Sequence, residues 1–204
     1  MIRNVIFDLG NVLVNVEYER FRQKIYQNGV SEEKYNSFFK GARYRILGYE
    51  AGEISTEEFT AKCINELGLK MTDDEFAFAF NDMFSEITEM KALVSRLAAN
   101  GKHNLFLLSN TSPLHFEHIK KNFGFVNMLH KFALSYELRS LKPDAAIYER
   151  TIRHLGIIPE ESIFIDDLRE NCEAAEKFGF NTINYDKKNH REFVKQFDFL
   201  VDSQ

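Results

Sequence analysis

The sequence predicts an α/β fold: a Rossmann-like parallel sheet of about five or six strands, flanked by helices, with an all-α helical cap inserted after the first strand. Short apolar runs that end in polar residues or glycine alternate with segments whose apolar residues recur at helical spacing. Residues 16–90 break this alternation and show helical spacing only. We therefore expect a discontinuous core made of residues 1–15 and 91–204, and a cap made of residues 16–90.

Five apolar runs are the candidate strands. Strands of a parallel sheet are buried on both faces, so they read as nearly continuous apolar runs rather than as alternating ones. Successive parallel strands need crossover connections, and helical segments lie between these runs. The candidate strands are residues 5–7, 104–108, 132–135, 162–165 and 180–185.

Helix boundaries carry recognisable signals in the core. Pro113 suits a first helical position, and Gly156 and Gly179 suit the positions just after a helix. The predicted core helices are residues 113–123, 145–155 and 170–178. In the cap we expect four or so short helices, with Ser31, Ser55 and Thr72 as candidate N-terminal caps.

Composition narrows the classes of partner. The net charge is −5, and Lys and Arg are scattered, so we expect no nucleic-acid partner. No run approaches the ~18 apolar residues of a membrane span, and no obligate protein partner is evident. Cys63 and Cys172 lack metal-ligand spacing, which favours reduced thiols in a cytoplasmic protein.

Polar residues cluster where the predicted strands end. Asp8 follows the first strand, Ser109 and Asn110 follow the second, and the pair Asp166 and Asp167 follows the fourth. Lys142 precedes Pro143 in the loop before a helix. Open parallel sheets bind ligands at the carboxyl ends of their strands, so we expect these groups to converge. Taken singly, each residue also suits an ordinary turn or helix start.

Four short motifs resemble those of the haloacid dehalogenase-like (HAD) superfamily, in the same order along the chain. They are Phe7-Asp8-Leu9-Gly10-Asn11-Val12-Leu13-Val14, Leu108-Ser109-Asn110, Leu141-Lys142-Pro143 and Phe164-Ile165-Asp166-Asp167. A cap between the first and second motifs resembles the helical-cap subgroup. The Asp-Leu-Gly-Asn-Val form and residues 48–55 resemble the branch that includes bacterial α-D-glucose-1-phosphate phosphatase.

The resemblance implies a Mg²⁺-dependent phosphatase acting on a small phosphorylated metabolite, such as glucose 1-phosphate. Asp8 would be the nucleophile and form an aspartyl-phosphate, and Lys142 would hold the phosphate and balance charge. Ser109 and Asn110 would bind the phosphate.

The metal ligands implied by the resemblance are an Asp8 oxygen, the Gly10 carbonyl and one of Asp166 and Asp167. We expect Asp167 to bind the metal directly. We expect Asp166 either to support the ligands without touching the metal or to bind the metal through a water. Asn171 lies four residues after Asp167, so it either orients that carboxylate or is an exposed helix residue.

Gly10 departs from the pattern of most phosphatases in this superfamily, which carry a second Asp there as the general acid. Glycine cannot transfer a proton, and such assistance is worth about 10²–10⁴ in rate. Our hypothesis is that an anomeric phosphate, whose leaving hydroxyl is more acidic, departs with less help. In the cap, Arg43, Tyr44 and Arg45 either face the substrate or form a solvated helix face. We interpret His103, His115 and His118 as surface or packing residues.

Two other functions remain open on the sequence. A 2-haloacid dehalogenase attacks carbon without a metal, but the surplus carboxylates at positions 166 and 167 would repel an anionic substrate. A catalytically retired binding or regulatory protein would fit the loss of an acid at Gly10, although Asp8, Ser109 and Lys142 are retained.

Overall fold

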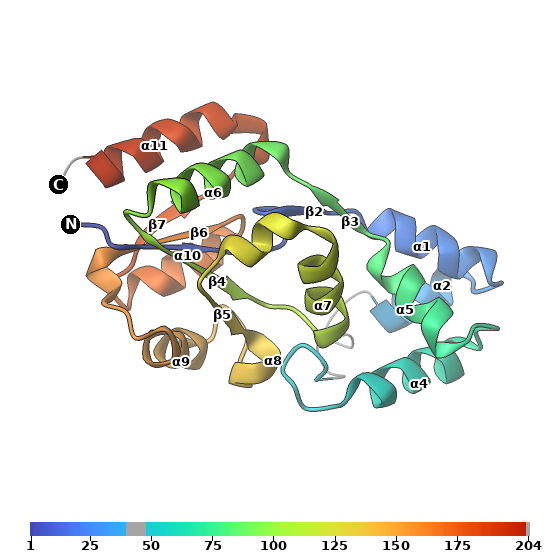
Figure 1. The fold of residues 1–204 in the computed structure, drawn as a ribbon. Coiled ribbons are helices and arrows are strands. Elements are labelled where there is room, and N and C mark those ends of the chain that lie inside the picture. Colours follow the sequence, from blue (N-terminus) through green and yellow to red (C-terminus); the bar gives the residue numbers. More distant parts are fainter. Residues whose placement is uncertain (40–47, 203–204) are drawn as a thin grey trace.

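The computed structural model describes residues 1–39 and 48–202, and within them the predicted α/β fold is present (Figure 1). In this part of the chain five parallel strands form one sheet in the order β5-β4-β1-β6-β7. The strands are β1 (Asn4–Phe7), β4 (Asn104–Ser109), β5 (Lys131–Leu134), β6 (Ser162–Asp166) and β7 (Asn181–Asn184). The expected strands are therefore confirmed, with ends that move by one or two residues.

Helices cover both faces of the sheet. One face packs against α6 (Thr88–Asn100), α7 (Pro113–Asn122) and α11 (His190–Asp202), and the other against α9 (Ala145–Leu155) and α10 (Arg169–Glu176). Figure 1 shows α6 and α11 side by side above the sheet and α9 below it. The shorter helical segments are α8 (Ser135–Leu138), η1 (Gly124–Met128), η2 (Pro159–Glu161) and η3 (Lys187–Asn189).

Alternation along the central strands assigns side chains to the two faces. Val5 and Phe7 belong to the core under α6, whereas Ile6 and Phe164 belong to the core under α9 and α10. Side chains two residues further along a strand point to the same face. This period places the side chains at positions 8 and 166, which follow Ile6 and Phe164, on the α9–α10 side of the carboxyl edge.

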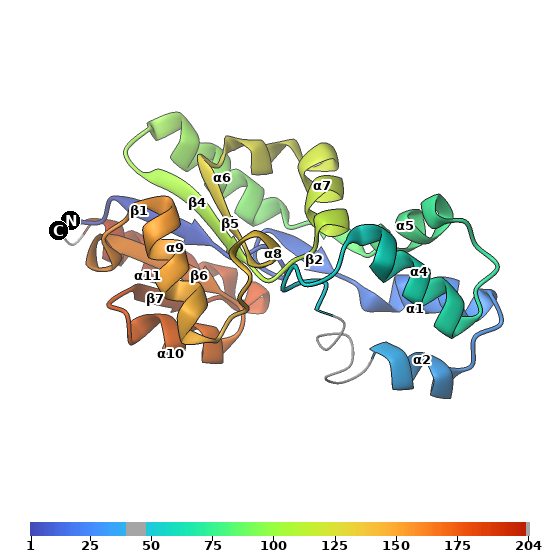
Figure 2. The same ribbon diagram turned by 90° about the horizontal axis from the view of Figure 1, so that it is seen from below.

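Four helices of the cap are described, and Figure 2 shows them beside the sheet domain. Their buried side chains form a hydrophobic cluster separate from the two clusters of the core. The four helices are α1 (Tyr18–Gln27), α2 (Glu32–Phe39), α4 (Thr56–Leu67) and α5 (Asp73–Asn81). Ser55 and Thr72 each form the capping box with a glutamate three residues on, and the Ser31 hydroxyl accepts from the Lys34 amide. In the described residues no helix is long and apolar enough to cross a membrane.

The expectation that residues 16–90 contain no strand is wrong. β2 (Val14–Val16) and β3 (Phe84–Glu86) pair antiparallel, with Val14 opposite Glu86. Each strand has three residues, too few to show a period of two, and the pairing joins segments about 70 residues apart. This ribbon ties the beginning of the cap to its end. The domain boundaries at residues 15 and 90 stay a prediction.

Candidate active site

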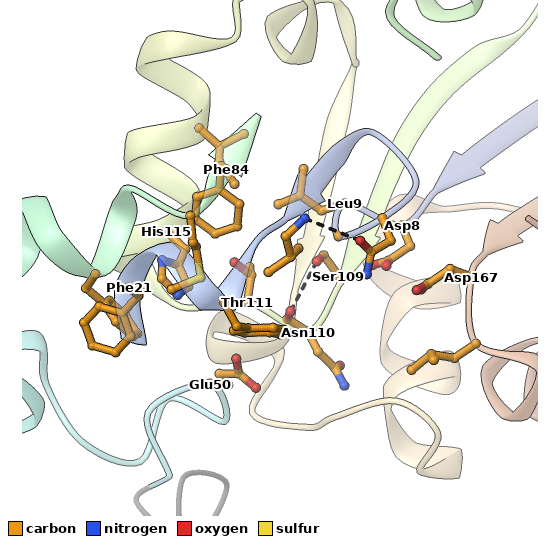
Figure 3. Close-up of a pocket in the computed structure, with 18 of the residues that line it drawn as sticks. Asp8, Leu9, Phe21, Glu50, Phe84, Ser109, Asn110, Thr111, His115 and Asp167 are labelled. Atoms are coloured by element: carbon orange, nitrogen blue, oxygen red, sulfur yellow. Dashed lines mark hydrogen bonds between the residues drawn. The ribbon is translucent and has the colours of Figure 1, made fainter. Parts of the chain in front are cut away.

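The predicted site residues meet at the carboxyl edge of the sheet. Asp8 directly follows the central strand β1, and its amide donates to the Ile165 carbonyl of β6 at 2.8 Å. Ser109 ends β4, and Asp166 ends β6. Figure 3 shows Asp8, Ser109, Asn110 and Asp167 around one end of a cavity. The parallel sheet therefore brings together side chains that are up to 159 positions apart in the sequence.

The Lys142 ammonium group lies between two carboxylates. Its Nζ donates to Asp8 Oδ1 at 2.7 Å, to Asp166 Oδ2 at 2.6 Å and to the Leu108 carbonyl at 3.2 Å. It also lies 5.3 Å from the centre of the Phe164 ring. The Lys142 side chain is 2% exposed, so these contacts replace its hydration shell.

The Asn110 side chain holds the backbone that carries Lys142. Asn110 Nδ2 donates to the Lys142 carbonyl at 2.9 Å, and Asn110 Oδ1 accepts from the Lys142 amide at 2.8 Å. The expectation for Asn110 concerned its backbone N–H, and this amide clamp was not foreseen. The pairing fixes the end of β4 to the loop before α9.

The two adjacent aspartates have different surroundings. Asp166 is fully buried, and its oxygens accept from Lys142, from Asn171 Nδ2 at 3.0 and 3.1 Å and from the Leu168 amide at 2.8 Å. Asp167 lines the cavity instead. Both interpretations of Asn171 are wrong: it is buried, and it orients Asp166 rather than Asp167. The chain turns between β6 and α10, which aims the amide at the carboxylate inside the turn.

Burial and crowding of like charges shift the ionisation of this cluster. Burial, reinforced by the charge of Asp166 and opposed by Lys142, raises the pKa of Asp8 to about 7. Burial and the charge of Asp166 also raise the pKa of Asp167. For Lys142, burial alone would lower the pKa, but the carboxylates of Asp8 and Asp166 outweigh it and raise that pKa. The carboxylates here are in excess over the cation that pairs with them.

The donor set fits a divalent cation. Asp8, Asp166 and Asp167 each offer an oxygen within 4.8 Å of the others. With all groups ionised, these three carboxylates and the Lys142 ammonium leave two negative charges in excess, which a divalent cation balances. All the donors are oxygens, which Mg²⁺ prefers. Gly10 lines the same cavity and offers a backbone carbonyl.

A cavity of about 610 Å³ extends from this cluster to the cap. Its far walls are aromatic and come from the cap, and its rim includes Glu50 from the turn before α4. The Glu50 carbonyl accepts from the Ser135 hydroxyl at 2.6 Å, which fastens this turn to the core. The expectation for Arg43, Tyr44 and Arg45 concerns residues outside those that the structure describes.

The three histidines near the second motif differ in setting. His103 and His118 are partly exposed. His115 packs in the interior, as one of the two interpretations held, but it also lines the cavity. Nothing in its local sequence signals this, because the aromatic side chains that surround it come from the cap.

Comparison with known proteins gives consistent results. The chain is 25% identical, over the full length of both proteins, to a D-ribitol-5-phosphate phosphatase of Bacteroides thetaiotaomicron. A HAD family enzyme of that organism, solved in complex with magnesium and inorganic phosphate, is 29% identical and superposes with a TM-score of 0.79, covering 92% of this chain and 96% of that one. A HAD-like family hydrolase of Porphyromonas gingivalis is 29% identical with a TM-score of 0.77, covering 97% and 98%.

A family model agrees with the motifs and with these relatives. It spans residues 2–179, which include β1, the cap and every strand end that contributes to the site. The chain belongs to the haloacid dehalogenase-like hydrolases.

Proposed function

We propose that this hydrolase is a Mg²⁺-dependent phosphatase that acts on a small sugar or polyol phosphate through an aspartyl-phosphate on Asp8. One observation carries the proposal: a buried Lys142 and a cluster of three aspartates lie together at the end of a cavity. That combination offers a nucleophile, a cation for phosphate and oxygen ligands for a metal.

The chemistry follows from the positions of these groups. The Asp8 carboxylate attacks phosphorus, the bond to the leaving oxygen breaks, and the leaving group takes a proton from water. A second water then attacks phosphorus, which releases inorganic phosphate and restores Asp8. Lys142, held in line by the Asn110 amide, faces the negative charge that spreads over the phosphoryl oxygens.

The residues proposed to bind the phosphate lie at the carboxyl end of β4. The Ser109 hydroxyl and the Asn110 N–H lie beside Asp8 along the cavity wall, before α7 begins. The N-terminus of α7 adds a partial positive charge on the same side. The cap closes the cavity opposite these groups and limits the access of water.

Asp8, the Gly10 carbonyl and Asp167 are the proposed Mg²⁺ ligands, and the bound ion supplies charge neutralisation at the phosphate. Asp166 already accepts hydrogen bonds from Lys142, Asn171 and the Leu168 amide. Its proposed role is therefore to hold Lys142 in place and to support the metal site without binding the Mg²⁺ directly. A HAD enzyme with a similar fold binds magnesium and phosphate, which supports this assignment.

The identity of the substrate is the finer part of the proposal. The relative from B. thetaiotaomicron is named for D-ribitol 5-phosphate, the ester of a primary alcohol. Our hypothesis for Gly10 favours glucose 1-phosphate, because an anomeric oxygen leaves with less assistance. A small phosphorylated metabolite fits both. We place the reaction in a reducing compartment such as the cytoplasm, since Cys63 and Cys172 are free.

A phosphate-release assay tests the proposal. Purified protein is given glucose 1-phosphate, glucose 6-phosphate and D-ribitol 5-phosphate, with Mg²⁺ and then with excess chelator. We expect release that needs Mg²⁺ and disappears in Asp8→Asn. A rate on glucose 6-phosphate equal to that on glucose 1-phosphate would remove the leaving-group hypothesis while keeping the phosphatase.

The same assay separates the alternatives. If wild type and Asp8→Asn are equally inert across the panel, the protein is a binding member of the family. If a 2-haloacid is dechlorinated in the presence of chelator, the dehalogenase reading replaces ours.

A further inference from the structure

His115 is buried between the cap and the core, in a fixed orientation. Its ring stacks on Phe80 with centroids 4.1 Å apart and meets the edge of Phe84 at 4.8 Å. The residue is 7% exposed. Phe80 lies on α5 of the cap and His115 on α7 of the core, so the ring sits at the junction of the two units.

One ring nitrogen of His115 is occupied and the other is available. Nδ1 lies 2.9 Å from Asn81 Oδ1, which can only accept, so Nδ1 carries the proton. Nε2 is then an acceptor, and among residues 1–39 and 48–202 the Nδ1 contact is the only side-chain hydrogen bond that His115 makes. Burial holds the pKa of His115 at about 3, so the ring stays neutral and keeps this acceptor at physiological pH.

His115 lines the same cavity as the aspartate cluster, but at its opposite end. Figure 3 shows His115 with Phe84 and Phe21 on the cap side, separated from Asp8 and Asp167 by Ser109 and Thr111. When the phosphate group of an ester lies at Asp8, the alcohol part of that ester extends toward the end of the cavity at His115. The aromatic walls suit the C–H faces of a polyol or sugar, while the histidine offers one acceptor for a hydroxyl.

We propose that His115 is a specificity-determining residue, whose Nε2 accepts a hydrogen bond from a hydroxyl group of the substrate remote from the phosphate. This inference rests on the proposed phosphatase function and specifies its substrate class. A phenylalanine at this position would make the same ring contacts, so packing alone does not require an imidazole. The Asn81 contact fixes which nitrogen faces the substrate.

The test compares two esters that differ in their hydroxyl groups: D-ribitol 5-phosphate and n-pentyl phosphate. We expect wild type to prefer the ribitol ester in kcat/KM. In His115→Phe the preference falls about 10- to 100-fold, mainly through KM, because a buried hydroxyl loses its partner. His118→Phe, three residues along the same helix and partly exposed, is the matched control and changes the preference less than about twofold.

Each outcome has a distinct meaning. A folded His115→Phe that keeps the wild-type preference overturns the inference. So does a wild type that hydrolyses both esters equally well. If wild type releases phosphate from no ester of the panel, the proposed function itself has failed.

A second measurement does not depend on the His115 variant folding. We expect ¹⁵N NMR of Asp8→Asn to show the Nδ1-protonated tautomer of His115. The Nε2 resonance should move when D-ribitol 5-phosphate is added with Mg²⁺ and stay in place with n-pentyl phosphate. An Nε2 resonance that ignores the ribitol ester at saturating concentration also overturns the inference.

Discussion

Replacing Lys142 with methionine removes the cation between two buried carboxylates and keeps most of the side-chain volume. Lys142 Nζ contacts Asp8 at 2.7 Å and Asp166 at 2.6 Å, and both carboxyl groups are buried. Removing one partner of a buried ion pair costs about 3–5 kcal/mol, because the remaining charge has neither water nor a counterion. For a chain of this size that corresponds to a midpoint about 6–20 °C lower.

Equilibrium urea unfolding in the presence of chelator measures this cost, since no metal then substitutes for the lost ammonium group. Lys102→Met is the control: Lys102 is exposed, and we expect a change within about 0.5 kcal/mol. A Lys142→Met protein within 1 kcal/mol of wild type would refute the reasoning. So would a double variant Lys142→Met/Asp8→Asn that is no more stable than Lys142→Met alone, because removing the uncompensated charge should restore about 1–3 kcal/mol.

Three further predictions concern the site and the cap. Asp167→Asn should raise the Mg²⁺ concentration needed for half-maximal phosphate release at least tenfold and lower the free energy of unfolding in urea by less than about 1 kcal/mol. Asp166→Asn should lower that free energy by about 1–3 kcal/mol, because four hydrogen bonds converge on the Asp166 carboxylate. Equal losses of stability in the two variants would contradict this difference. Burial lowers the pKa of His115 to about 3, so the unfolded chain binds the extra proton and His115 makes stability fall by up to about 1.4 kcal/mol per unit as pH drops from about 6.5. Because the raised pKa of Asp8 contributes the opposite slope in both proteins, the test is the difference between their urea midpoints: wild type should lose stability relative to His115→Phe as pH falls, and a difference that does not change with pH would contradict this. Gly52→Ala should lower the free energy of unfolding by about 1–3 kcal/mol, because φ of Gly52 is +71° and a Cβ there would meet the Tyr136 carbonyl. Gly101→Ala, at φ +60° with open space around the added Cβ, should lower it less. Equal shifts in the thermal midpoints of the two variants would contradict this reasoning.

The sequence by itself predicted the α/β class and which polar residues would share one edge of the sheet. Apolar runs ending at Asp8, Ser109 and Asp166 specify buried parallel strands, and parallel strands present their carboxyl ends together. The capping boxes at Ser55 and Thr72 are equally local, because each involves residues three positions apart. Such features depend only on residues that lie a few positions apart in the sequence, so they can be predicted from it.

Pairings between distant segments were decided only in the tertiary structure. The period of two along the strands puts Asp8 and Asp166 on the α9–α10 side, where Lys142 contacts both. Asp8 and Asp167 line the cavity, whereas Asp166 is fully buried. The β2–β3 ribbon and the amide clamp of Asn110 on Lys142 likewise join segments 32 or more positions apart. The sequence shows which polar side chains lie at the carboxyl edge of the sheet. The partner that each side chain contacts depends on the direction in which it points after the strands and helices have packed together.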